Sequence, residues 1–308
     1  MCIRDRTDLI IIGAGPAGMT AALYAARAGK SVLMLEKETF GGQITYSPRV
    51  ENYPGIKQIS GNEWASGLVE QILDLGVRTE LETVTGIRPD GPRWIVETME
   101  GIHIGRALIL ATGVSHRRLG LPREEDLMGA GLSTCAVCDG AFYAGEDTAV
   151  VGGGDTALQE ALFLSSLCRR VTVIHRRGEF RGEHRLQEAL HQRDNVELRL
   201  HSIVSALEGT DSLTGVTLQD TRSGVEEHLA VTGLFVAIGQ LPHNEAFASV
   251  VRLDESGYIL AGEDTHTSSP GVFAAGDCRA KEVRQLTTAV GDGAAAALAA
   301  CRYVDSLS

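Results

Sequence analysis

The stretch STCAVCDGAF (133–142) carries residue types that do redox or metal chemistry. Cys135 and Cys138 stand three positions apart, and Asp139 follows directly. Cysteines at this spacing serve as half of a zinc site, as a structural disulfide, or as a dithiol that exchanges electrons. The rest of the sequence has to decide among these three uses.

The remaining cysteines argue against a metal. A structural zinc site takes four nitrogen or sulfur ligands, usually from two close pairs, and the sequence has no second C-x-x-C. The other candidates are scattered: Cys168, Cys278, Cys301, His116 and His175. We therefore expect no metal.

A purely structural disulfide is also disfavoured. So small a loop removes little entropy from the unfolded chain, and such a bond does not persist in a reducing compartment. A redox-active pair remains, with Asp139 as an acid that protonates a leaving thiolate if its surroundings raise its pKa. Asp139-Gly140 is also a turn signal, and both roles are compatible.

The first element behind this chemistry is a glycine loop. Residues 8–18 read DLIIIGAGPAG, an apolar strand followed by Gly13, Gly15 and Gly18 in the pattern G-x-G-x-x-G. A helical stretch over 17–28 and a second strand over 31–36 follow, and the strand ends in Glu36. This strand–helix–strand unit predicts a dinucleotide site in which Glu36 accepts a hydrogen bond from a ribose 2′-hydroxyl.

A second loop repeats the pattern. AVVGGGDTA (149–157) supplies Gly152 and Gly154, and the strand after the next helix ends in His175, Arg176 and Arg177. His175 follows Gly152 by the same 23 positions that separate Glu36 from Gly13. Basic residues in this slot, with Arg181 nearby, predict binding of the NADPH 2′-phosphate, although a solvated loop of charges is the plainer alternative.

Composition limits the function classes. The chain has 308 residues, is 44% apolar and has a formal net charge of −12, which disfavours nucleic acids and anionic membranes as main partners. We recognise no signal peptide and no apolar segment of about 20 residues. Six cysteines indicate a reducing compartment, and we expect a cytoplasmic enzyme. The first six residues, MCIRDR, fit no element, so we expect them to precede the fold and give Cys2 no role.

Further elements complete an α/β chain. LILATG (108–113) and LFVAIG (234–239) are apolar strands that end in glycine, one for each loop. Between the first strand–helix–strand unit and LILATG, Ser60 and Glu63 form a capping box that predicts a helix with Trp64, Leu68, Ile72 and Leu75 on its apolar face. Asp90-Gly91 predicts a hairpin, with 93–99 as one arm. We place domain boundaries near 114–118 and near 243.

Nine motifs occur in an order that resembles the low-molecular-weight, bacterial-type thioredoxin reductases. They are GAGPAG (13–18), GGQI (41–44), VENYPG (50–55), ATG (111–113), CAVCDG (135–140), GGGDTA (152–157), HRR (175–177), TSSPGVFAAGD (267–277) and RQLTTAVGDG (284–293). The resemblance runs from about residue 7 to about residue 303. It implies two Rossmann-like dinucleotide-binding domains, with an NADPH domain (117–244) inserted into an FAD domain (1–116 and 245–308).

The resemblance also implies site residues and partners. The FAD site would comprise Gly13, Gly15, Gly18, Glu36, Gly42, Gln43, Asn52, Gly113, Asp277, Arg284 and Gln285. The NADPH site would comprise Gly152, Gly154, Asp155, Thr156, His175, Arg176, Arg177 and Arg181. The enzyme would be a homodimer acting on oxidised thioredoxin.

The implied mechanism is a relay in which NADPH reduces FAD, FAD reduces the Cys135–Cys138 disulfide, and the dithiol reduces thioredoxin. By resemblance, Cys138 faces the flavin, Cys135 attacks the partner, Asp139 is the acid, and the NADPH domain rotates between steps. Thr134 and Ala136-Val137 depart from the residues that the family commonly has there, which leaves the docking surface open. Cys278 is either a third redox thiol or, as we favour, a small buried residue.

Other functions stay open at this point. One alternative is a reductase of a different thiol protein, such as a peroxidase-linked carrier. A dithiol oxidase is a second, although it would not need the HRR triplet. A non-enzymatic regulator or metal-binding scaffold is a third, and the intact cysteines, Asp139 and both nucleotide slots weigh against it.

Overall fold

The computed structural model describes residues 3–307, with side chains from Thr7 onward. The chain forms two compact units, one made of the residues up to Ser115 together with those from Leu241 onward, and one made of His116–Gln240. The expected boundaries after residues 116 and 244 fall close to these limits, and the cofactor assigned to each part stays a prediction. Cys2 lies outside the described residues.

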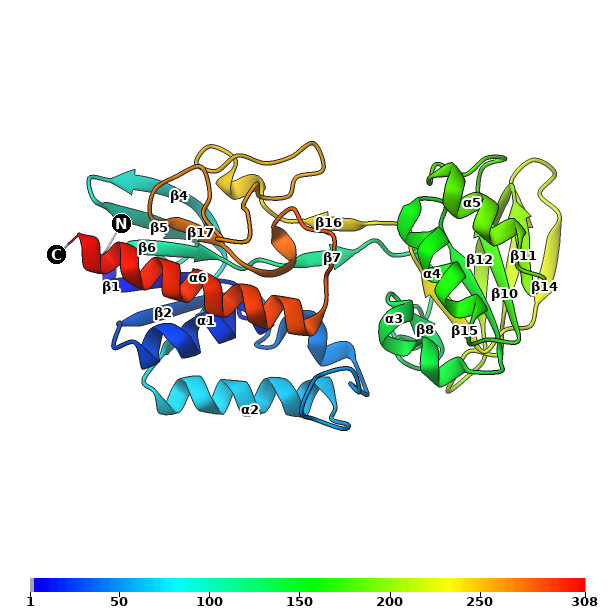
Figure 1. Ribbon diagram of the computed structural model, residues 1–308, viewed down its shortest axis with the longest axis horizontal. Coiled ribbons are helices and arrows are strands. Elements are labelled where there is room, and N and C mark those ends of the chain that lie inside the picture. The colour runs from blue at the N-terminus through cyan, green and yellow to red at the C-terminus, as the bar shows by residue number, and fades with distance from the viewer. Residues whose placement is uncertain (1–2, 308) are drawn as a thin grey trace. The chain divides into compact units, whose positions relative to one another are not determined.

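A seven-stranded sheet organises the first unit in the order β3-β2-β1-β6-β5-β4, with β17 also paired to β6 (Figure 1). Its strands are β1 (Ile3–Ile12), β2 (Val32–Glu36), β3 (Arg78–Leu81), β4 (Val84–Asp90), β5 (Arg93–Thr98), β6 (Ile102–Leu110) and β17 (Val272–Ala274). β3, β2, β1, β6 and β17 are parallel to one another. The predicted hairpin adds β5 antiparallel to β6, and β4 antiparallel to β5.

The expectation that the first six residues precede the fold is wrong for Ile3–Arg6. Their backbone continues β1 and pairs with β6, where Arg6 lies opposite Ile104. The charged letters of this segment concealed the strand, because apolar periodicity begins only at Leu9.

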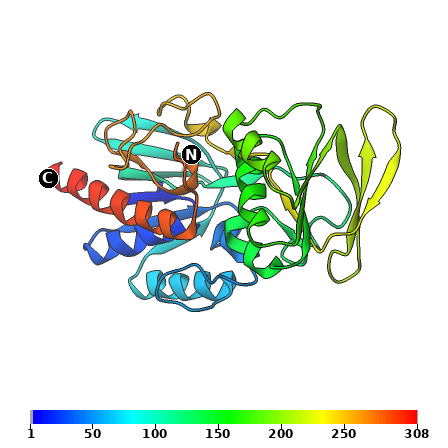
Figure 2. The same ribbon diagram turned by 45° about the vertical axis from the view of Figure 1, so that its right-hand side comes forward.

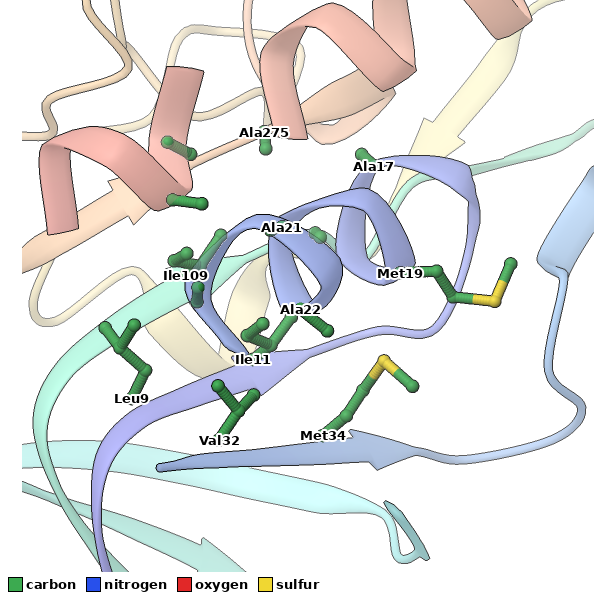
Figure 3. Packing of buried hydrophobic residues seen from close by; sticks show 14 of the residues in the cluster. Leu9, Ile11, Ala17, Met19, Ala21, Ala22, Val32, Met34, Ile109 and Ala275 are labelled. Atoms are coloured by element: carbon green, nitrogen blue, oxygen red, sulfur yellow. The ribbon is translucent and has the colours of Figure 1, made fainter. Parts of the chain in front are cut away.

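Three helices cover one face of this sheet: α1 (Pro16–Arg27), α2 (Gly61–Asp74) and α6 (Leu286–Ser306). Short 3₁₀ turns complete the unit at η1 (Gly42–Tyr46), η3 (Glu245–Phe247) and η4 (Gly276–Cys278). The helices α1 and α6 lie side by side (Figure 1) because their facing residues are small: a Cβ on Gly293 would lie 2.2 Å from the Ala17 carbonyl oxygen. Figure 3 shows Ala21 and Ala22 of α1 above Ile11 of β1.

The capping box predicted at the start of α2 is present, with Ser60 and Glu63 bonded in both directions. Trp64, Leu68 and Ile72 are buried on the apolar face, as expected. Leu75 is not part of that face, because the helix ends at Asp74 and Leu75 is 42% exposed at its C-cap.

The second unit is built on a parallel sheet in the order β11-β10-β9-β15-β8. Its strands are β8 (Leu132–Ser133), β9 (Asp147–Val151), β10 (Arg170–His175), β11 (Val196–Leu200) and β15 (Gly233–Val236). Its helices are α3 (Ala136–Asp139), α4 (Asp155–Ser165) and α5 (His184–His191), with the 3₁₀ turn η2 (Gly140–Tyr143). An antiparallel sheet adds β12 (Ser202–Glu208), β13 (Gly215–Asp220) and β14 (Glu226–Leu229).

Successive residues of β9 point to opposite faces of this sheet, as a strand requires. Val150 packs with Leu158 under α4, whereas Ala149 and Val151 pack with Val216 of the antiparallel sheet. The helices and the antiparallel sheet therefore lie on opposite faces (Figure 2). The chain leaves and re-enters the first unit through β7 (Val114–His116) and β16 (Gln240–Pro242), which pair with each other.

Candidate active site and dinucleotide sites

The cysteine pair lies at the carboxyl end of β8, an edge strand of the second unit. Cys135 and Cys138 are joined by a disulfide, with their Cα atoms 5.3 Å apart. Cys135 is the N-cap of the single turn α3, and its sulfur accepts a hydrogen bond from the Cys138 amide at 3.2 Å. The Cys135 amide in turn donates to the Ser133 hydroxyl at 3.0 Å. Both cysteines are partly exposed, so the pair can be reached by a reductant or a protein disulfide.

Asp139 closes the same turn and is held by Ser133. The Ser133 hydroxyl donates to Asp139 Oδ2 at 2.6 Å. Burial raises the pKa of Asp139, and the bond from Ser133 offsets only part of that effect. Asp139 therefore keeps its proton to higher pH than an exposed aspartate does, which suits the predicted role of an acid beside a leaving thiolate.

Sequence reasoning missed two residues of this site, Ser133 and Glu160. Glu160 belongs to α4, which packs on α3, and its Oε1 accepts a hydrogen bond from the Ala136 amide at 3.4 Å. It lies 24 positions from Ala136. Only its place beside Ala161 on the predicted helix could have drawn notice to it.

The first glycine loop connects β1 to α1, as predicted. Gly13 has φ of +103°, and a Cβ there would lie 2.3 Å from the Ala111 carbonyl oxygen. A Cβ on Gly18 would lie 1.9 Å from the Gly13 carbonyl oxygen, so this position also needs glycine. A Cβ on Gly15, by contrast, would meet nothing within 4 Å. The loop thus presents open backbone at the N-terminus of α1, where a pyrophosphate would bind.

Glu36 ends β2 beside this loop and is almost fully buried. Its Oε2 accepts a hydrogen bond from the Ala14 amide at 2.7 Å, and its Oε1 accepts from the amides of Lys37 and Glu38 at 2.9 Å. Three backbone donors therefore orient the carboxylate next to the glycine loop. The ribose contact predicted for it stays a prediction.

The other residues predicted to hold FAD lie in the same unit. Asn52 and Gln285 meet at 3.4 Å between Nδ2 and Oε1, and Arg284 stacks over Tyr258 at 4.2 Å from the ring centroid. Gly42 and Gln43 begin η1, where Gly42 approaches Gly15: a Cβ on Gly42 would lie 3.2 Å from the Gly15 Cα.

Asp277 supports the fit of a polar ligand in this unit. Its Oδ1 is buried and has no hydrogen-bond partner among the described residues. Burial raises the pKa of Asp277, while Lys281 and Arg284 act in the opposite direction. A buried oxygen without a donor is rare in native proteins, and a hydroxyl of a bound cofactor would satisfy it. A Cβ on Gly113 would also meet nothing within 4 Å, so a second part of the backbone is open.

The second glycine loop repeats the first in detail. A Cβ on Gly152 would lie 2.4 Å from the Ala237 carbonyl oxygen, as Gly13 does with Ala111, and Gly154 is open as Gly15 is. The third position of this G-x-G-x-x-A motif holds Ala157 in place of a glycine. A Cβ on Gly152 would lie 2.5 Å from the Ala157 Cβ, so the alanine side chain occupies the space that Gly152 leaves open. Asp155 and Thr156 are exposed in the first turn of α4, and Asp155 Oδ1 accepts from the Glu183 amide at 2.7 Å.

The three residues of the HRR triplet differ in their exposure. Arg176 and Arg177 are exposed, as is Arg181, so all three can meet a phosphate. His175 is buried instead: a Cβ on Gly153 would lie 2.3 Å from its ring, and its Nε2 lies 3.1 Å from the Glu179 carbonyl oxygen. Burial lowers the pKa of His175, as do the neighbouring arginines. The geometry favours His175 as a support of the phosphate loop, and its contact with NADPH stays a prediction.

Cys278, the other candidate redox thiol, is fully buried at 0% exposure, and its sulfur lies 3.4 Å from the Leu110 carbonyl oxygen. Burial raises the pKa of its thiol. It therefore behaves as a small core residue. Among the described residues, no helix combines the length and apolar character needed to cross a bilayer.

Known proteins resemble the chain along most of its length. Residues 7–293 match the family described as pyridine nucleotide-disulphide oxidoreductase. A thioredoxin reductase of Mycolicibacterium smegmatis is 44% identical, over 96% of each chain. A bifunctional thioredoxin reductase/thioredoxin of Mycobacterium leprae is 45% identical over 96% of this chain, which spans 66% of that relative's length.

A solved structure, the thioredoxin reductase of Streptococcus pyogenes, is 39% identical with a TM-score of 0.94 and covers 98% of this chain and 99% of its own. The expected fold, two Rossmann-like units with one inserted into the other, is confirmed. The resemblance drawn from the nine motifs is confirmed as well. The chain belongs to the pyridine nucleotide-disulphide oxidoreductase family and, as expected, uses FAD and NADPH.

Proposed function

We propose that this protein is a thioredoxin reductase, which carries electrons from NADPH through FAD to the Cys135–Cys138 disulfide and then to oxidised thioredoxin. The observation that carries the proposal is the partly exposed disulfide on α3, with an acid of raised pKa in the same turn. The relatives that match nearly the full chain bear the same name and support it.

When bound, FAD would supply the two-electron chemistry that links NADPH to the disulfide. The chain's own residues do the rest. Cys135, at the N-cap of α3, attacks the partner's disulfide, and Cys138 then displaces the partner and re-forms the internal bond. Asp139, whose pKa burial raises and whose carboxyl group Ser133 holds, gives a proton to the leaving thiolate.

We also propose that the inserted unit rotates during the cycle. The disulfide belongs to the unit 116–240, and the glycine loop assigned to FAD belongs to the other. One face of a flavin cannot hold the nicotinamide and the disulfide together, so the two must take turns. The paired strands β7 and β16 are the natural hinge. A homodimer in the cytoplasm is part of the same proposal, on the strength of the motif resemblance.

The deciding experiment follows NADPH oxidation by the purified, FAD-loaded protein with a panel of protein disulfides. Thioredoxin should support turnover, and Cys138→Ser should abolish it while FAD absorbance is still bleached by NADPH. If a peroxidase-linked carrier turns over and thioredoxin does not, the partner assignment is wrong and the alternative reductase is right.

The same assay tests the arginine slot. NADPH should be preferred to NADH by about tenfold or more in kcat/KM, because a charge-assisted hydrogen bond contributes about 1.5–3 kcal/mol. Arg177→Ala should reduce the preference, and equal rates for the two nucleotides in the unaltered protein would sink the assignment of the arginines.

A further inference from the structure

Glu160 is a buried carboxyl group beside the redox pair that the relay described above does not use. Its Oε1 meets the amide of Ala136, the residue that directly follows Cys135. Its Oε2 is buried without a hydrogen-bond partner among residues 3–307. A buried polar atom without a hydrogen-bond partner costs about 1–3 kcal/mol, and more when it is charged, so such atoms are rare in native proteins.

The charges that face Glu160 come from one side. The pKa of Glu160 is raised to about 7, chiefly by burial; the Ala136 amide opposes this shift, and a charge on Asp139 of α3 adds to it. Tyr143 of η2 adds no charge, because burial and Asp139 raise the pKa of its phenol and so keep it neutral. α5, which packs on α4 too, carries His184, Arg185, Glu188 and His191, and none of these affects Glu160. Glu160 thus populates both protonation states near neutral pH.

Reduction of the disulfide changes the charge on this turn. Two electrons and one proton convert the bond between Cys135 and Cys138 into one thiol and one thiolate. The thiolate adds a negative charge to the turn that holds α3, against which Glu160 packs. A like charge at short range disfavours an ionised carboxylate, so the pKa of Glu160 must rise on reduction.

We propose that Glu160 is a proton-linked positioning residue of the redox centre: it takes up one proton when the Cys135–Cys138 disulfide is reduced and releases it when the disulfide re-forms. The balanced step is disulfide plus Glu160 carboxylate plus two electrons plus two protons, giving thiol, thiolate and Glu160 carboxylic acid. The electrons come from FAD in the proposed reaction, on which this inference rests, or from any added dithiol. By becoming neutral, Glu160 of α4 limits the total negative charge around α3 when the thiolate forms.

The test is the pH dependence of the disulfide's reduction equilibrium. The FAD-loaded protein is equilibrated with dithiothreitol redox buffers between pH 6 and 9, and the reduced fraction is counted by thiol alkylation and mass spectrometry. Above pH 7, the unaltered protein should take up one more proton per electron pair than Glu160→Gln does. The reduction equilibrium of the two proteins should then diverge tenfold per pH unit, which is about 30 mV per unit for a two-electron couple.

Two further variants sharpen the comparison. Glu188→Gln, an exposed glutamate of α5, removes the same charge in the same unit and should leave the slope unchanged. Asp139→Asn removes the charge that raises the pKa of Glu160, so the steeper segment should begin at lower pH. Identical slopes in the unaltered protein and Glu160→Gln would overturn the proposal.

A second measurement covers the case in which Glu160→Gln does not fold. At pH 8, infrared difference spectra of the unaltered protein should gain a protonated-carboxyl band on reduction by dithiothreitol, and its absence would refute proton uptake. Because a chemical dithiol drives both tests, they are independent of NADPH and thioredoxin. Equal slopes in the unaltered protein and Glu160→Gln, with normal thioredoxin turnover, would refute this inference alone. A steeper slope in the unaltered protein without thioredoxin turnover would refute the proposed function alone.

Discussion

A buried ion pair in the first unit allows a sharp test of how the FAD site is held. The guanidinium of Arg279, just after η4, bonds Asp292 of α6 through Nε and Nη2, each at 2.8 Å. Asp292 also accepts hydrogen bonds from the Gly276 amide at 2.9 Å and from Lys281 Nζ at 3.0 Å. The same guanidinium meets Glu263 at 3.1 Å, but that side chain is 91% exposed. One arginine thus has a buried and an exposed carboxylate partner.

Asp292→Ala should lower the free energy of unfolding by about 3–5 kcal/mol, because it removes the carboxylate that Arg279 and Lys281 share in the protein interior. Glu263→Ala should lower it by no more than about 1 kcal/mol, because water already screens that pair. Asp292→Ala should also weaken FAD retention, since the Gly276 amide next to Asp277 loses its acceptor.

The assay is urea unfolding at one fixed FAD concentration, with the FAD affinity of each variant measured separately. Bound FAD adds RT ln(1 + [FAD]/Kd) to the apparent free energy of unfolding, and this contribution is subtracted for each variant before they are compared. Both tryptophans of the sequence, Trp64 and Trp94, belong to the first unit, and their fluorescence reports its unfolding. If the two variants lose stability equally, the burial argument fails. A loss below about 1 kcal/mol for Asp292→Ala would refute it as well.

Acid should remove the difference between the two variants. Burial by itself would raise the pKa of Asp292, but its bonds to Arg279 and Lys281 outweigh burial and hold the pKa below its usual value. A carboxylate whose folded-state pKa is depressed stabilises the fold at pH above the unfolded value, about 3.9. The contribution of Asp292 is therefore complete at pH 5–8 and is lost as the pH falls through its folded-state pKa.

Two other substitutions probe the glycine loops. Gly18→Ala should abolish FAD binding, because its Cβ would lie 1.9 Å from the Gly13 carbonyl oxygen, whereas Gly15→Ala should leave a folded apoprotein with weaker FAD binding; circular dichroism and FAD titration separate the two. His175→Ala should raise the KM for NADPH without changing its salt dependence, since the ring is buried and supports the loop, whereas Arg177→Ala should reduce that salt dependence.

Much of the site could be predicted because its requirements are local. The backbone around Gly13 and Gly18 leaves no room for a Cβ, so these positions must be glycine, and the loop can be recognised from the sequence. The capping box at Ser60 and the disulfide between Cys135 and Cys138 likewise join residues three positions apart.

Tertiary packing alone decided the rest. Glu160 meets Ala136 across 24 positions, and Asp292 meets Arg279 across 13 positions through different elements. Whether His175 faces a phosphate or the underside of a loop depends on what packs against β10. Such contacts set burial, and burial sets protonation, since desolvation is the largest cause of the raised pKa of both Asp139 and Glu160. The sequence by itself determined which groups can exchange electrons and bind dinucleotides, and the folded structure decided which carboxyl groups beside them are buried and so hold their protons to higher pH.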